Sequence, residues 1–195
     1  MNEGLIPKRY AKALYKFAVE RGADAGLYRL MGNLSHSFAD NPALNRTIDN
    51  PFVEDAKKVE LLKTAAHVDE NVPATAMKAV SEADAEVFAD FLKLLVENRR
   101  LPLAWAASRA YCDIYRKENS IYRVKVVSAK PLDKQEQQRL TKFITAHLDG
   151  GTSEMTFATD PDIIGGFTVD IDNERLDASV KNELKQLRLK LLSRV

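Results

Sequence analysis

The first part of the chain repeats apolar residues every three or four positions, which is the spacing of amphipathic helices. Glycine and proline interrupt this pattern at Gly22, Asn41-Pro42 and Asn50-Pro51, where helices are expected to end or begin. The pattern therefore predicts an all-α bundle of six helices before about residue 118, with an interruption in the fifth near Ser81. The expected helices cover approximately residues 7–21, 24–40, 42–48, 53–66, 74–98 and 102–117.

Beyond Glu118-Asn119 the apolar period falls to two, which is typical of half-buried strands. Residues 121–128 predict a first strand, residues around 155–157 a second, and residues 167–171 a third, and the stretch up to Val180 leaves a fourth open. A capping-box spacing at Asp133 predicts a helix between the first two strands.

A last helix is expected at the C-terminal end. A short extended piece at Arg175-Leu176 precedes Asp177, which is expected to cap a helix that opens at Ala178. The order strand–helix–strand–strand–helix predicts a small α+β domain over residues 119–195, after a helical domain over residues 1–118.

Two helices of the N-terminal half carry much apolar surface. The first has one apolar face, and the fifth is apolar around most of its circumference. Such a helix is either central in a bundle or offers a second side to a partner, and the two interpretations are compatible. The residues concerned are Tyr10, Ala13, Leu14, Phe17 and Ala18 on the first helix and Val87, Phe88, Phe91, Leu92, Leu94, Leu95 and Val96 on the fifth.

The last helix combines an apolar seam with positive charge. Val180, Leu184, Leu187 and Leu191 recur at heptad-like spacing, and basic residues outnumber the one acid, Glu183. A basic amphipathic helix can contact a membrane surface or an acidic helical partner, or it can cover the small sheet.

The composition excludes several classes of function. With 29 Lys and Arg against 28 Asp and Glu, the chain has no global field that would attract nucleic acid. The one cysteine, Cys112, lies on an expected core stripe and fits a reducing compartment. We expect no signal peptide and no membrane span, so that any membrane association is made through partners.

No catalytic or metal-binding set is expected. His36, His67 and His147 lack the spacing of a metal site. Gly165-Gly166 is followed by a strand and not by Lys-Ser/Thr, so it is not a typical phosphate loop. The nearby aspartates alternate with apolar residues and fit turns and strand edges better than a cation site. We therefore expect no enzyme, no cofactor and no metal.

The segment from Asp160 to Val180 carries the most specific motif. It contains a turn opener, an apolar pair, a glycine pair, an alternating strand and Asp-x-Ser-Val. The string resembles the C-terminal signature of the δ subunit of F-type ATP synthase, a family that includes the mitochondrial oligomycin-sensitivity-conferring protein. The matching positions are Asp160, Pro161, Gly165, Gly166, Asp177, Ser179 and Val180.

The resemblance extends over the chain. The aromatic-Ala-Lys-Ala string at Tyr10, the corner Glu97-Asn-x-Arg-Leu101 and the string Ser128-Ala-x-Pro-Leu132 resemble family motifs in the same order. It implies a six-helix bundle and a smaller C-terminal domain, in a non-catalytic stator component. Such a protein joins the α3β3 catalytic head to the peripheral stalk, so that the head resists rotor torque during proton-driven ATP synthesis.

The family also implies partners and a location. An apolar groove between the first and fifth helices would bind the N-terminal helix of an α subunit. The matching positions are Tyr10, Ala13, Leu14 and Phe17, facing Phe91, Leu92 and Leu95. The C-terminal domain, which Gly165, Gly166 and the last helix shape, would meet the b subunits of the stalk. The protein would lie peripherally on the cytoplasmic face of a bacterial inner membrane, without forming homo-oligomers.

Two other interpretations remain open. One is an unrelated adaptor that binds helical peptides in the bundle. The other is a small enzyme that uses the Gly165-Gly166 turn to bind an anion.

Overall fold

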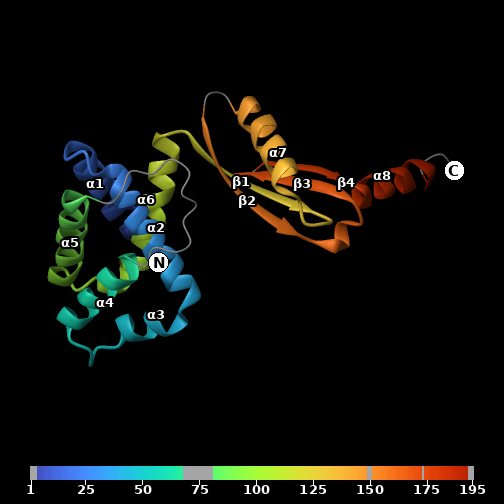
Figure 1. Cartoon of the computed structure of the whole chain (residues 1–195). Helices are drawn as coiled ribbons and strands as arrows, with labels where there is room; N and C mark the ends of the chain where they lie inside the picture. Colours follow the sequence, from blue (N-terminus) through green and yellow to red (C-terminus); the bar gives the residue numbers. More distant parts are fainter. Residues whose placement is uncertain (1–3, 68–80, 149–150, 173, 193–195) are drawn as a thin grey trace. The chain divides into compact units, whose positions relative to one another are not determined.

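The computed structural model describes residues 4–67, 81–148, 151–172 and 174–192 of the chain. It divides into two compact units, residues 1–115 and 116–195, close to the domain boundary expected from the sequence. The first unit is helical, and the second combines a four-stranded sheet with helices (Figure 1).

The helical character of the N-terminal half is confirmed for the residues that the structure describes. A 3₁₀ turn replaces the expected first residues of the helix at Pro102, and the stretch 68–80, where a loop and the start of a fifth helix were expected, lies outside the described residues. The helices are α1 (Leu5–Glu20), α2 (Asp24–Asp40), α3 (Pro42–Asp49), α4 (Asp55–His67), α5 (Glu82–Glu97), the 3₁₀ helix η1 (Leu101–Leu103) and α6 (Ala104–Glu118).

The core of this unit forms around α2, which contacts α1, α3, α4 and α5. Leu27, Leu30, Met31 and Leu34 of α2 are fully buried, as the helical spacing of their apolar side chains requires. Cys112 is also buried, which confirms the expected core position of this residue.

The first turn of α5 approaches α2 closely. Ser81 and Asp84 form a capping box, in which each side chain accepts a hydrogen bond from the backbone N–H of the other residue. The carboxylate of Asp84 lies against Gly26 of α2, where an added Cβ would overlap it. The cap therefore fixes both the start of α5 and its contact with α2.

Two polar side chains of α2 satisfy the end of α4. The side-chain amide of the buried Asn33 donates to the carbonyl of Ala66 at 3.0 Å, and the hydroxyl of Ser37 donates to the carbonyl of Ala65 at 2.9 Å. These carbonyls belong to the last turn of α4, where carbonyl groups find no N–H donor within their own helix. The two bonds hold the end of α4 against α2.

We expect Asn33→Ala to lower the free energy of unfolding by about 1–3 kcal/mol, because the buried carbonyl of Ala66 loses its donor. Urea unfolding of the full chain measures this difference. Thr47→Ala is the matched control, because this exposed hydroxyl bonds only the Ala43 carbonyl of its own helix. Equal stability of the two variants would contradict the structural role of Asn33.

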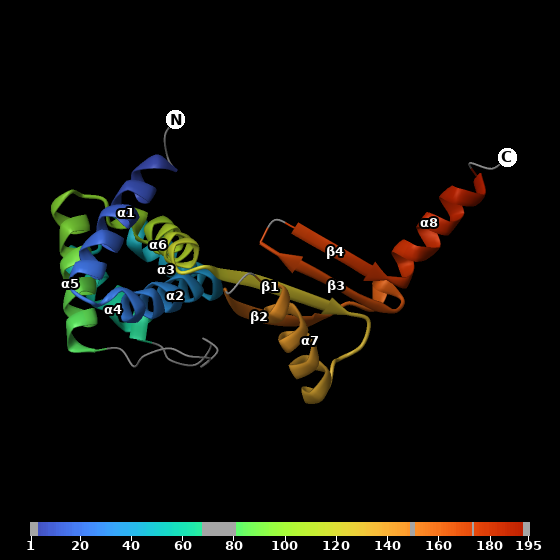
Figure 2. The same cartoon turned by 90° about the horizontal axis from the view of Figure 1, so that it is seen from above.

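The second unit contains a mixed sheet in the order β2-β1-β3-β4. β1 and β2 are parallel, and β3 is antiparallel to both β1 and β4. The connection between β1 and β2 is the helix α7, which covers one face of the sheet (Figure 2). The elements are β1 (Ile121–Ser128), α7 (Lys134–His147), β2 (Thr152–Thr159), the 3₁₀ helix η2 (Pro161–Ile163), β3 (Gly166–Ile171), β4 (Glu174–Ser179) and α8 (Val180–Leu192).

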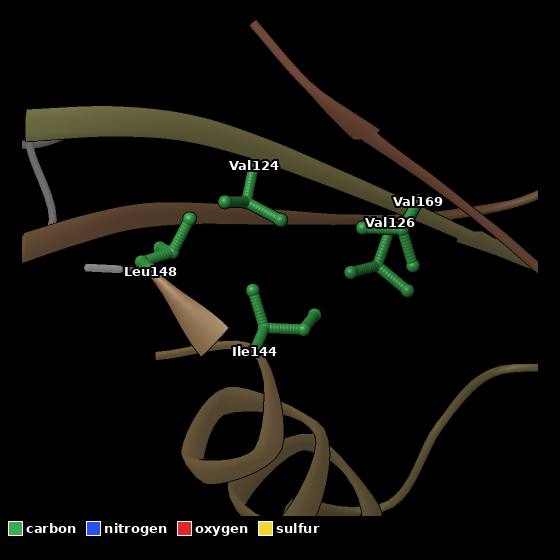
Figure 3. Close-up of a cluster of buried hydrophobic side chains, with 5 residues drawn as sticks. All are labelled: Val124, Val126, Ile144, Leu148 and Val169. Carbon is green, nitrogen blue, oxygen red and sulfur yellow. The ribbon is translucent and has the colours of Figure 1, made fainter. Parts of the chain in front are cut away.

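The core of the second unit lies between α7 and the sheet. Val124 and Val126 of β1 and Val169 of β3 face Ile144 of α7 and Leu148 just after it (Figure 3). Val126 and Val169 are opposite each other in the register of β1 and β3, so they point to the same face. The period-two pattern of the sequence therefore identified the buried face correctly.

The last part of the second unit differs from the prediction. Residues 174–179 form a full strand, β4, where only a short extended piece was expected, so the order is strand–helix–strand–strand–strand–helix. α8 accordingly begins at Val180 and not at Ala178. The sequence left β4 open and the predicted order omitted it, because most of its side chains are exposed and its sequence lacks the apolar alternation typical of a half-buried strand.

Candidate functional site

Among the described residues, no three His, Cys, Asp or Glu side chains are grouped so that they could hold a metal ion. The pKa values of Tyr111 and Asp177 are shifted by their surroundings. Burial raises the pKa of the Tyr111 hydroxyl, which donates to the carbonyl of Asp24 at 3.1 Å. Hydrogen bonding by Ser179 lowers the pKa of Asp177. Both groups are engaged in structural hydrogen bonds with the backbone.

α1 presents an apolar stripe beside its buried face. Ile6, Tyr10, Ala13 and Phe17 follow one another at intervals of four, three and four residues, which places them on one side of the helix. Ala13 and Phe17 are exposed, the ring of Phe17 to 36%, and Ile6 and Tyr10 are half-buried. We call these four residues the α1 stripe.

The other side of α1 is occupied by α6. The ring of Tyr15 packs against the rings of Tyr111 and Tyr115, at centroid distances of 6.1 and 6.3 Å. Between these two sides, Leu14 is buried together with the other inward residues of α1. The α1 stripe is therefore apolar surface that the core of the first unit does not fully bury.

α5 lies beside α1 (Figure 2), but the residues of α5 that were expected to line the groove are not at its surface. Phe91, Leu92 and Leu95 are buried in the core, with exposed fractions of 3% or less. Leu94, which is not among the positions that the family resemblance implies, is 44% exposed. The structure thus divides the seven predicted residues: Tyr10, Ala13 and Phe17 are accessible, whereas Leu14 and the three α5 residues lie beneath the surface.

Two arginines border the α1 stripe. The guanidinium of Arg100 lies 5.6 Å from the ring centroid of Tyr10 and donates to its hydroxyl at 3.1 Å. The guanidinium of Arg21 lies 4.6 Å from the ring centroid of Phe17. The combination of accessible aromatic rings and arginine is typical of protein-binding surfaces.

The signature residues between 160 and 180 build the junction of β3, β4 and α8. The carboxylate of Asp160 accepts a hydrogen bond from the Asp162 N–H at 3.0 Å, and Pro161 begins η2. Gly165 accepts a hydrogen bond at its carbonyl from the Val180 N–H at 3.0 Å, which connects the start of α8 to the start of β3. Gly166 has a φ of +76°, in the region that favours glycine.

The hydroxyl of Ser179, and not the carboxylate of Asp177, caps the first turn of α8. This buried hydroxyl accepts from the Asn182 N–H at 3.2 Å, the contact that an N-cap residue makes. Asp177 instead accepts at its carboxylate from the Ser179 N–H at 3.0 Å. The predicted cap at Asp177 is wrong because β4 extends to Ser179.

α8 exposes its apolar residues. None of its side chains is buried among those that the structure describes, and five leucines are each more than half exposed. They are Leu184, Leu187, Leu189, Leu191 and Leu192. A helix with this much accessible apolar surface has the chemistry of a docking element.

Comparisons with known proteins agree over nearly the whole chain. A family model described as ATP synthase delta (OSCP) subunit matches residues 6–191. The chain is 36% identical to ATP synthase subunit delta of Bacteroides thetaiotaomicron over 194 residues, covering 100% of this chain and 97% of the relative. It is 32% identical to the subunit delta of Carboxydothermus hydrogenoformans, covering 94% of each.

A solved structure has a similar fold. A chain of the Toxoplasma gondii mitochondrial ATP synthase hexamer superimposes with a TM-score of 0.64 at 23% identity, covering 98% of both chains. Among the described helices, none combines the length and apolarity that a membrane crossing requires.

Proposed function

This chain belongs to the ATP synthase delta (OSCP) subunit family, and we propose that it is the stator component that joins the α3β3 head to the peripheral stalk. In this role it carries no catalytic residues and resists the torque of the rotor. Its helices α1–α6 would form the six-helix bundle of the family, bound to the head. It would lie on the cytoplasmic face of a bacterial inner membrane, attached only through the complex.

The observation that carries the proposal is that each unit exposes a separate apolar helix surface. The first unit offers the α1 stripe beside α5, and the second offers the leucines of α8. A connector needs two such surfaces, because it must hold two partners at once. A single-site adaptor, the alternative interpretation, needs only one.

The proposed partner of the first surface is the N-terminal helix of an α subunit, bound along the α1 stripe and Leu94 of α5. The buried Leu14, Phe91, Leu92 and Leu95 would support this surface from below without touching the partner. An amphipathic helix that lays its apolar face on such a surface is a common mode of recognition.

The proposed partner of the second surface is the C-terminal part of the b subunits, bound by α8. Gly165 and Gly166 contribute by fixing the start of this helix and of β3. The heptad-like positions of α8 are those that helix–helix packing requires.

Co-purification of the full-length chain with α3β3 and with b tests the proposal. Retention of both partners is expected. Binding of a helical peptide without any binding to α3β3 would instead support the unrelated adaptor.

Leu187→Asp is expected to weaken binding of b at least tenfold, because it places a charge within the apolar seam of α8. The folded unit should be unaffected, since this side chain is 54% exposed. Calorimetric titration of the full chain with a peptide from the C-terminal part of a b subunit measures the change in affinity. Gln186→Asp introduces the same residue away from the apolar seam of α8, and this variant should bind b as the unaltered chain does. A similar loss of affinity in both variants would contradict binding of b through the seam.

A further inference from the structure

The two helices that border the proposed α-subunit site carry opposite charges. On α1, Arg9 and Lys16 lie one turn to either side of the exposed Ala13. On α5, Asp90 and Glu97 lie one turn to either side of the exposed Leu94. We call Arg9, Lys12 and Lys16 the basic wall, and Glu86, Asp90 and Glu97 the acidic wall.

The basic and acidic walls differ in net charge, although each also has a neighbour of opposite sign. All six wall residues are exposed. Within the two helices one residue of opposite sign lies near each wall, Glu20 on α1 and Lys93 on α5, so each wall keeps two charges in excess. Arg99 and Arg100 follow Glu97 just beyond the end of α5, and Arg100 is held on the hydroxyl of Tyr10. In the described part of the chain no ion pair joins the two walls, so their charges are available to a partner.

We propose that these walls select an amphipathic helix whose apolar stripe has acidic residues along one flank and basic residues along the other. The inference rests on the proposed binding of an α-subunit helix at this site and specifies the chemistry of that helix. Its acidic flank lies along α1 and its basic flank along α5, because each flank then faces a wall of opposite sign.

This arrangement also fixes the direction of the bound helix. Turning a helix end for end, with its apolar stripe still facing the protein, exchanges its left and right flanks. The reversed helix would place its acidic flank on the acidic wall and its basic flank on the basic wall. Apolar contacts alone do not distinguish the two directions, whereas the walls do.

The experiment uses the full-length chain and a synthetic peptide from the N-terminus of the α subunit of the same organism. Calorimetry at low and high salt compares three variants with the unaltered chain. They are Arg9→Glu with Lys16→Glu, Asp90→Lys with Glu97→Lys, and the four substitutions together.

Each pair of substitutions gives both walls the same sign, so one flank of the peptide is repelled in either direction. We expect about tenfold weaker binding at low salt, with the difference reduced at high salt. The fourfold variant exchanges the walls at unchanged net charge, so the peptide can bind in the opposite direction and the affinity should return to within about twofold. Lys57→Glu with Lys63→Glu, on the exposed surface of α4, is the control for net charge.

The outcomes separate the two levels of the proposal. Failure of the unaltered chain to bind the peptide overturns both the site and the selection of charge. Normal binding that the wall pairs leave unchanged, or a fourfold variant that binds as weakly as the pairs, overturns the selection of charge alone.

Discussion

Replacement of Phe17 by aspartate is expected to weaken binding of the α-subunit N-terminal peptide by about a hundredfold. The ring of Phe17 is the most accessible aromatic group of the α1 stripe, and Arg21 packs on its face. Aromatic residues with nearby arginine commonly account for 2 kcal/mol or more of binding energy at an interface, which is about thirtyfold in affinity. The introduced carboxylate adds the cost of an unpaired charge within an apolar contact.

The measurement is calorimetry of the full-length variant with the same peptide. Val19→Asp is the matched control, because Val19 is also an exposed apolar residue near the end of α1 but lies away from the stripe. Both substitutions place an acid near the C-terminal end of α1, so their effects on helix stability should be similar. Equal losses of binding in the two variants, or unaltered binding by Phe17→Asp, would remove the α1 stripe from the proposed site.

Gly166→Ala is expected to destabilise the second unit by about 2–4 kcal/mol. Its φ of +76° is unfavourable for alanine by about 1–2 kcal/mol. The new Cβ would also collide with the carbonyl oxygen of Ala178 and come within 3.3 Å of the Ser179 Cα, and both are backbone atoms of β4. Because Gly166 and Ser179 are paired in the sheet, relief of this collision requires separation of β3 from β4.

Urea unfolding measures the change in the free energy of unfolding. Hydrogen exchange of the β3 and β4 amides shows whether the loss is located in these two strands. Gly165→Ala provides the comparison, because its new Cβ would meet only the side chain of Val180, at 3.0 Å, and Gly165 is not among the residues of positive φ. We expect a loss below about 1 kcal/mol for that variant. If Gly166→Ala proved as stable as the unaltered chain, the close pairing of β3 and β4 would be wrong.

The sequence predicted the parts of the fold whose local pattern agrees with their final environment. The alternation in β1 predicted its buried face, and the capping box at Asp133 and Glu136 marks the start of α7 in the structure. The sequence left β4 open because this strand pairs through its backbone with β3 and has no apolar face of its own. Pairing partners that are distant in sequence leave no mark in a local pattern.

The candidate site shows a related limit. Periodicity identified α5 as unusually apolar, and the family resemblance placed Phe91, Leu92 and Leu95 in the binding groove, whereas all three are buried in the core. The adjacent Leu94 is the residue that solvent reaches. On a helix that is apolar around most of its circumference, only the position of the neighbouring helices decides which leucine faces outward.

The exposed leucines of α8 have a consequence for the life of the chain before assembly. A freshly synthesised copy carries five large apolar side chains, each more than half exposed, on one short helix. Surfaces of this kind promote aggregation and are the features that chaperones and quality-control proteases recognise. Copies made in excess of the partner proposed to bind α8 should therefore be degraded faster than assembled copies. The cellular amount of this chain would then follow the amount of that partner.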